Sequence, residues 1–145
     1  MSNEIVKNPA GFVQKLEQSF AQALPTHITK EHFSRALLTE FRRNPKLLEC
    51  DEKSIAAGVM TFAQLGLMLG VNGAGWLIPF KHEATVIIGY QGLVDLCYRS
   101  GRVKSIFSDE VYENDVFKYQ LGLNPILEHT PNIKSDRGKM VVEWD

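Results

Sequence analysis

Residues 64–101 constrain the fold more strongly than any other part of this chain. Their pattern is that of a buried helix end, a glycine-rich turn, two short strands and a second helix. Asn72-Gly73 predicts the tight turn, and Gly89 separates the second strand from the helix that follows. A hairpin over residues 76–88 that runs into a helix over residues 90–100 is therefore the predicted centre of the fold.

Helices are predicted before this centre and strands after it. Thr29 and Asp51 are suitable N-caps for two of the helices. A helix-rich first half followed by hairpins around one embedded helix defines an α+β fold with a small antiparallel sheet. We expect one domain spanning residues 1–145. The first predicted helix covers residues 9–24, the second runs from the Thr29 cap to Asn44, and the third runs from the Asp51 cap to the glycines at 66 and 70. The predicted later strands cover residues 103–111, 117–119, 126–129 and 140–144.

The chain lacks the motifs of common enzymes, so we expect a protein that is not an enzyme and that needs no metal or cofactor. The sole Gly-Lys pair, Gly138-Lys139, lacks the glycine spacing and the Ser or Thr of a phosphate-binding loop. No cysteine has a partner at the spacing of a zinc finger. The acidic run over residues 109–115 leaves one alternative open, a hydrolase or nuclease that holds a divalent ion there.

We expect a cytoplasmic protein with no membrane partner. No uninterrupted apolar run reaches the roughly 18 residues that a membrane helix needs. The first residues lack the charged and then apolar pattern of a signal peptide. Two cysteines, Cys50 and Cys97, are then expected to be reduced thiols.

Cations gather around the predicted hairpin and helix, although the net charge of the chain is −1. Residues 81–107 carry four cations against two acids, whereas residues 108–145 carry four cations against eight acids. A local strip of cations with exposed planar groups is typical of single-stranded nucleic acid binding. Ordinary surface charges and core aromatics remain the alternative interpretation. The candidate contact residues are Lys81, Tyr90, Gln91, Arg99, Arg102 and Lys104.

Several short motifs occur in a fixed order over residues 30–131, and together they resemble the RecT family of phage single-strand annealing proteins. The resemblance implies ATP-independent binding of single-stranded DNA and annealing of complementary strands during phage-type recombination. The motifs are Asn44-Pro45-Lys46-Leu47-Leu48, Gln64-Leu65-Gly66-Leu67, Leu77-Ile78-Pro79-Phe80, Gly89-Tyr90-Gln91-Gly92-Leu93, Tyr98-Arg99-Ser100-Gly101 and Val111-Tyr112-Glu113-Asn114-Asp115.

The resemblance also implies partners and a site. Members of this family act on single-stranded DNA and the annealing duplex as rings or filaments, beside a phage exonuclease, inside a bacterial cell that carries the phage or prophage. Carried over, the helix beginning at Tyr90 and the segment 99–105 would line the DNA groove. Residues 68–72 replace a proline-containing turn of the family.

Family chains also continue beyond this sequence, so we expect the domain to lack its C-terminal part. An alternative function is therefore a truncated oligomerising scaffold that docks a partner nuclease without annealing DNA itself. The net acidity of residues 108–145 favours that alternative.

Overall fold

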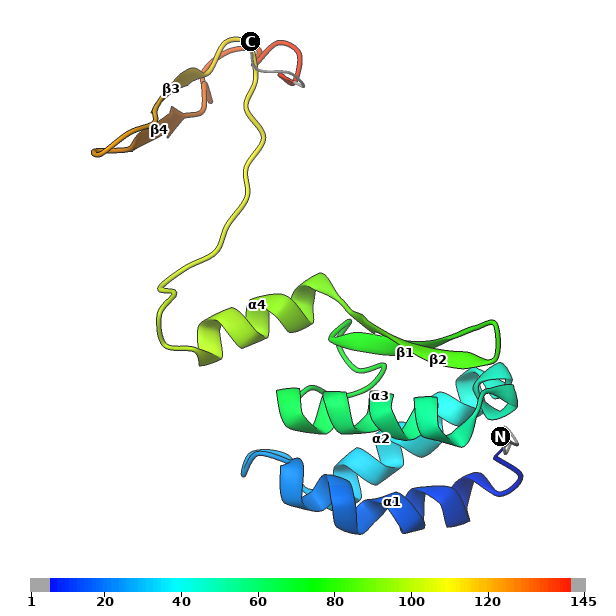
Figure 1. The fold of residues 1–145 in the computed structure, drawn as a ribbon. Coiled ribbons are helices and arrows are strands. Elements are labelled where there is room, and N and C mark those ends of the chain that lie inside the picture. The colour runs from blue at the N-terminus through cyan, green and yellow to red at the C-terminus, as the bar shows by residue number, and fades with distance from the viewer. Residues whose placement is uncertain (1–5, 142–145) are drawn as a thin grey trace. The chain divides into compact units, whose positions relative to one another are not determined.

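A computed structural model describes residues 6–141 of the chain (Figure 1). The chain divides into two compact units, residues 1–104 and residues 105–145, and each unit has its own internal packing. The predicted α+β class is confirmed, because α-helices occur together with two antiparallel two-stranded sheets, and one helix lies between the sheets in sequence. The two hairpins form separate sheets, one in each unit. The organisation as one domain stays a prediction.

Three α-helices open the first unit, as the sequence predicts, and a short 3₁₀ helix forms in the connection between the second and the third. They are α1 (Pro9–Ala23), α2 (Lys30–Arg43), the 3₁₀ helix η1 (Pro45–Glu49) and α3 (Glu52–Leu65). Both predicted N-caps are confirmed. Thr29 Oγ1 accepts a hydrogen bond from the His32 N–H at 3.3 Å, and Asp51 Oδ1 accepts one from the Ser54 N–H at 3.0 Å.

Strands β1 (Gly75–Phe80) and β2 (Glu83–Ile88) form the predicted hairpin, which lies on α3 (Figure 1). Gly58 in the middle of α3 makes this contact possible. A Cβ atom at Gly58 would collide with Leu77 of β1 and crowd Val86 of β2. Only the missing side chain lets the hairpin approach the helix this closely.

Helix α4 (Tyr90–Arg99) follows β2 directly and ends as predicted, with Gly101 in the left-handed conformation at φ 69°. The core of the unit lies between α1, α2, α3 and the inner face of the hairpin. Its largest fully buried side chains are Phe20, Phe33, Phe62, Leu37, Leu47, Ile55, Leu69 and Leu77. Within the described residues, no helix has the length and apolar character that crossing a membrane would require.

The predicted strand over residues 103–111 is wrong. The described structure has no strand between Val103 and Glu110, and only Tyr112 forms a β-bridge, to Met140. An alternating pattern forms a strand only where another backbone supplies hydrogen-bond partners. Of the predicted final strand, Met140 forms that bridge, and residues 142–145 lie outside the described part of the chain. Both cysteines are free thiols, Cys50 buried and Cys97 half-buried.

A polar network organises the second unit, whose strands β3 (Val116–Gln120) and β4 (Ile126–Thr130) pair as predicted. The Asp115 side chain is fully buried at its centre. Its carboxylate accepts hydrogen bonds from Arg137 Nη2 at 2.6 Å and Nε at 3.1 Å, and from His129 Nε2 at 3.0 Å. The backbone N–H groups of Asn132 and Tyr112 donate to it at 2.9 and 3.1 Å.

The Arg137 guanidinium connects this carboxylate to two further groups. It lies 4.1 Å from the centroid of the Tyr112 ring, and its Nη2 donates to the Glu110 carbonyl at 2.9 Å. No described residue of this unit is a buried apolar side chain. The unit therefore depends on charge-assisted hydrogen bonds where the first unit depends on hydrophobic packing.

Substitution Asp115→Ala is expected to loosen the second unit selectively, because it leaves the Arg137 guanidinium and two backbone N–H groups without their acceptor. Native-state hydrogen exchange on the full chain should show faster exchange in β3 and β4 and unchanged exchange in α1–α3. Glu128→Ala, at an exposed acid of the same hairpin, is the control and should change neither. Equal protection of β3 and β4 in both variants would contradict the role of Asp115.

The same network sets a pH dependence. The donors around Asp115, Arg137 first among them, hold the pKa of its carboxyl well below the ordinary range. The unfolded chain therefore takes up this proton at a higher pH than the folded chain does. Protection of β3 and β4 should be full at neutral pH and fall as the pH is lowered below the ordinary range of an aspartic acid.

Candidate nucleic-acid interface

The hairpin tip holds Lys81 in a conformation that is unusual for a lysine. The register pairs Phe80 with Glu83, which leaves Lys81 and His82 as a two-residue turn with φ values of 47° and 66°. Such a turn favours Asn and Gly, because both positions need positive φ. The Asp51 N–H donates to the His82 carbonyl at 2.9 Å and anchors the tip to the start of α3. A lysine at such a strained position is a candidate for a functional role.

Tyr90 and Gln91 open helix α4, whose first turn has no side-chain cap. The Tyr90 side chain is 75% exposed. The Gln91 side chain lies against Gly73, where a Cβ atom would meet its Oε1. Gln91 also lines a pocket of about 590 Å³, together with Arg99 and with residues 66–68, 71, 72 and 74. These two residues therefore place an exposed ring and an amide beside backbone N–H groups that favour an anion.

Arg99 anchors α4 to α3. Its Nη2 donates to the carbonyl of Leu65, the last residue of α3, at 2.8 Å. Its Nε lies 3.0 Å from Asp95 Oδ2, one turn earlier on α4. Arg99 thus satisfies a carbonyl that the end of α3 leaves without a helical partner. The sequence analysis predicted that Arg99 contacts the ligand. In the structure, its guanidinium instead uses much of its hydrogen-bonding capacity on Leu65 and Asp95.

Arg102 and Lys104 follow the left-handed turn at Gly101, and both are exposed. The backbone N–H of Arg102 donates to Ser100 Oγ at 3.2 Å. Because the predicted strand is absent, the two cations lie on an irregular segment. Their side chains can therefore adapt to a flexible partner more readily than side chains on a sheet.

These six residues follow the hairpin and α4 in sequence, and we call them the hairpin–helix strip. Lys81 lies in the turn between β1 and β2. Helix α4 continues from the opposite end of β2 (Figure 1). A six-residue strand is about 20 Å long, and a ten-residue helix is about 15 Å long. At the rise of about 3.4 Å per nucleotide of a strand stacked as in B-form DNA, such a strip matches roughly ten nucleotides. Its length suits a polymer better than a small molecule.

A basic face on α2, which the sequence analysis missed, borders a second pocket of about 560 Å³. His32, Arg35 and Arg43 line it, and Arg43 Nη1 donates to the Gly70 carbonyl at 3.4 Å. Burial raises the pKa of Glu40 in this pocket, and Arg43 opposes that shift. The sequence could have predicted this basic face, because the spacing of the three residues places them on one side of the helix.

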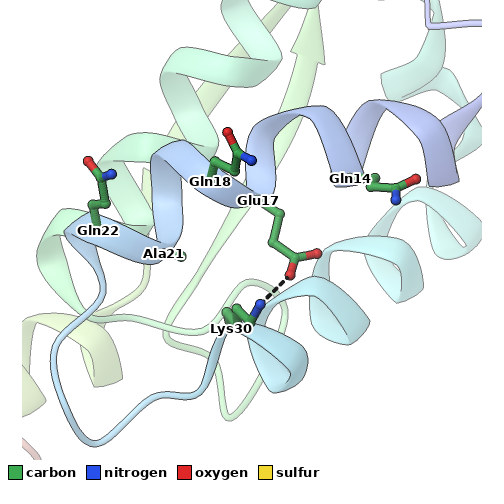
Figure 2. Close-up of a pocket in the computed structure, with 6 residues that line it drawn as sticks. All are labelled: Gln14, Glu17, Gln18, Ala21, Gln22 and Lys30. Atoms are coloured by element: carbon green, nitrogen blue, oxygen red, sulfur yellow. Dashed lines mark ion pairs between the residues drawn. The ribbon is translucent and has the colours of Figure 1, made fainter.

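A third pocket, of about 450 Å³, lies between α1 and the start of α2 (Figure 2). Glu17 and Lys30 meet across it at 3.1 Å, and this contact raises the pKa of Lys30. Its other lining residues are Gln14, Gln18, Ala21 and Gln22. The pocket is uncharged apart from the ion pair and belongs to no part of the hairpin–helix strip.

The acidic run over residues 109–115 is engaged in structure. Asp115 is held by Arg137 and His129, and Glu110 accepts a hydrogen bond from the Tyr112 hydroxyl at 2.7 Å. Among residues 6–141 there is no group of three acidic, histidine or cysteine side chains placed to bind a metal ion. The run therefore offers no geometry that favours the metal nuclease alternative.

Comparison with known proteins gives a family and two relatives. A family model described as the RecT family matches residues 31–144. The chain is 36% identical to Protein RecT of Escherichia coli (strain K12) over 83% of its own length and 48% of that protein. It is 29% identical to the uncharacterized protein YqaK of Bacillus subtilis (strain 168), over 66% of its own length and 33% of that protein. The chain thus spans about half or less of each relative.

Substitution Arg99→Ala is expected to lower the free energy of unfolding by about 1–2 kcal/mol, because it removes a charge-assisted hydrogen bond to the end of α3. Arg102→Ala is the matched control and should change it by less than about 0.5 kcal/mol. Urea denaturation followed by circular dichroism measures both. Equal stabilities of the two variants would show that Arg99 does not anchor α4.

Substitution Lys81→Asn is expected to leave the free energy of unfolding unchanged or to raise it by up to about 1 kcal/mol, because Asn adopts positive φ more readily than Lys. Lys81→Ala removes the same charge but keeps the backbone cost, so it should be less stable than Lys81→Asn. The same denaturation experiment ranks the two. A less stable Lys81→Asn variant would mean that the lysine itself supports the turn.

Proposed function

Because the chain belongs to the RecT family, we propose that it binds single-stranded DNA without ATP and anneals complementary strands in phage-type homologous recombination. The hairpin–helix strip is the single observation that best supports this proposal. It combines cations, an exposed aromatic ring and an extended shape, which are the features that a nucleic acid strand needs.

The contact residues in this proposal are Lys81, Tyr90, Gln91, Arg102 and Lys104. The cations neutralise phosphates and release their counterions, which supplies binding free energy independent of base sequence. Tyr90 offers a planar surface to a base, and Gln91 offers an amide beside the free N–H groups of α4. In this proposal Arg99 acts as a positioning residue that fixes α4 on α3.

Annealing follows from the same chemistry. Two DNA strands repel each other through their phosphates, and a protein that neutralises one strand lowers that repulsion. The protein reads no bases, so Watson–Crick pairing between the strands selects the correct partner. No nucleophile, general base or metal is required for this role, because no covalent bond is made or broken.

We extend the proposal to assembly and location. We expect copies of the chain to assemble on DNA as a ring or filament in the bacterial cytoplasm, beside a phage exonuclease. Sedimentation with and without an oligonucleotide tests this. Assembly that depends on DNA supports annealing, whereas assembly that ignores DNA would favour the scaffold alternative.

The double substitution Arg102→Ala/Lys104→Ala is expected to weaken binding and to lower its salt dependence. For single strands each phosphate contact contributes about 0.7 to the slope of log affinity against log salt concentration, so the slope should fall by about 1.4. Fluorescence anisotropy with an oligothymidylate at several salt concentrations measures it. The unfolding free energy should stay within about 0.5 kcal/mol of the original, since both side chains are exposed.

Lys118→Ala/Lys134→Ala is the matched control, because it removes the same charge from the second unit. It should leave the slope nearly unchanged. An annealing assay with complementary oligonucleotides completes the test. Salt-independent binding, or annealing no faster with the protein than without it, would overturn the proposed function.

A further inference from the structure

The β1–β2 hairpin has one buried face and one exposed face. Along β1 the side chain of Leu77 points into the core, whereas Trp76, Ile78 and Phe80 are exposed. The register places Ile87 of β2 opposite Trp76, so it shares the exposed face. We call Trp76, Ile78, Phe80 and Ile87 the outer apolar face.

The outer apolar face exposes enough contiguous apolar surface to indicate a binding site. Trp76 is 39% exposed and Phe80 is 63% exposed, and Ile78, which lies between them on the same strand face, is 42% exposed. Single exposed apolar residues are common, but a contiguous group with two large aromatic rings marks a binding surface. Tyr90 follows the hairpin directly and extends the series of aromatic side chains into α4.

The face is rigid, because the hairpin is held at both ends. Near the tip, the Ala84 N–H donates to Ser54 Oγ at 2.9 Å. At the open end, the Gly70 N–H donates to the Gly75 carbonyl at 2.8 Å, and the Gly89 N–H donates to the Ala74 carbonyl at 3.0 Å. A surface that is already ordered loses little conformational entropy when a flexible strand binds to it.

The charges around this face favour a nucleic acid. Lys81 Nζ lies 5.4 Å from the centroid of the Phe80 ring, so a cation and an aromatic surface stand side by side at the tip. At the other end the face meets Tyr90 of the hairpin–helix strip. Glu83, opposite Phe80, is the single acid of the two strands. Cations beside aromatic rings are the combination that single-stranded DNA binding needs.

We propose that the outer apolar face is a stacking platform for the bases of the bound strand, with Trp76 and Phe80 as its contact residues. The proposal rests on the proposed function and adds the base contacts to it. Trp76 and Phe80 lie four residues apart on one strand, which corresponds to about 13 Å. The bound strand therefore contacts them with different bases, and the cations of the hairpin–helix strip hold its phosphates alongside.

Two oligonucleotides of equal length and charge test the platform on the full chain. One is an oligothymidylate, and the other carries abasic sites along its whole length. The original protein should bind the oligothymidylate at least about tenfold more tightly, because stacking adds to the phosphate contacts. Trp76→Ala/Phe80→Ala should remove most of that difference while leaving affinity for the abasic strand and the salt slope unchanged.

Tryptophan fluorescence provides a readout that does not depend on these substitutions. The chain has two tryptophans, so Trp144→Phe leaves Trp76 as the sole emitter. Its emission should be quenched by the oligothymidylate and not by the abasic strand. Leu127→Ala, which truncates an exposed apolar residue of the second unit, is the control for the affinity measurement.

The outcomes separate this proposal from the proposed function. Equal binding of both strands by the original protein, with unchanged Trp76 emission, would overturn the platform and leave DNA binding intact. Failure to bind either strand would overturn both. If Trp76→Ala/Phe80→Ala instead reduces the assembled mass in the absence of DNA, the face is an interface between copies of this chain, and the platform is wrong.

Discussion

The close contact between Gly58 of α3 and the β1–β2 hairpin is the constraint on which the rest of the first unit depends. Because Gly58 has no side chain, Leu77 can be buried against the helix, and the hairpin lies flat on the core. Every other residue of β1 must then point away from the core. The same contact therefore exposes Trp76 and Phe80, holds Lys81 at the tip, and fixes the point at which α4 begins.

The cations near α4 divide into two kinds, and this division shapes the proposed site. Arg99 is committed to the protein, since its guanidinium satisfies the Leu65 carbonyl and pairs with Asp95. Arg102 and Lys104 are exposed beyond the end of the helix. The two roles are complementary, because Arg99 holds α4 on α3, and Arg102 and Lys104 follow directly after the end of that anchored helix.

The second unit is stabilised in a different way. Its centre is the buried Asp115 carboxylate, which Arg137, His129 and two backbone N–H groups satisfy. A buried charge is tolerated only when hydrogen bonds satisfy it, so each of these partners contributes to the stability of the second unit. Two acids of the run over residues 109–115, Glu110 and Asp115, belong to this structural network.

The sequence alone determined the features that depend on local interactions. The N-caps at Thr29 and Asp51, the left-handed Gly101 and the two hairpins could all be predicted, since turns, caps and side-chain periodicity act over a few residues. The order of the short motifs along the chain also indicated the RecT family. Only the tertiary structure decided that residues 103–110 form no strand, that Arg99 is an anchor, and which face of the hairpin is exposed. Each of these depends on whether a partner distant in sequence is in place. Leu65 is that partner for Arg99 and Gly58 for Leu77, whereas residues 103–110 have no strand partner. Local patterns carry no information about such partners.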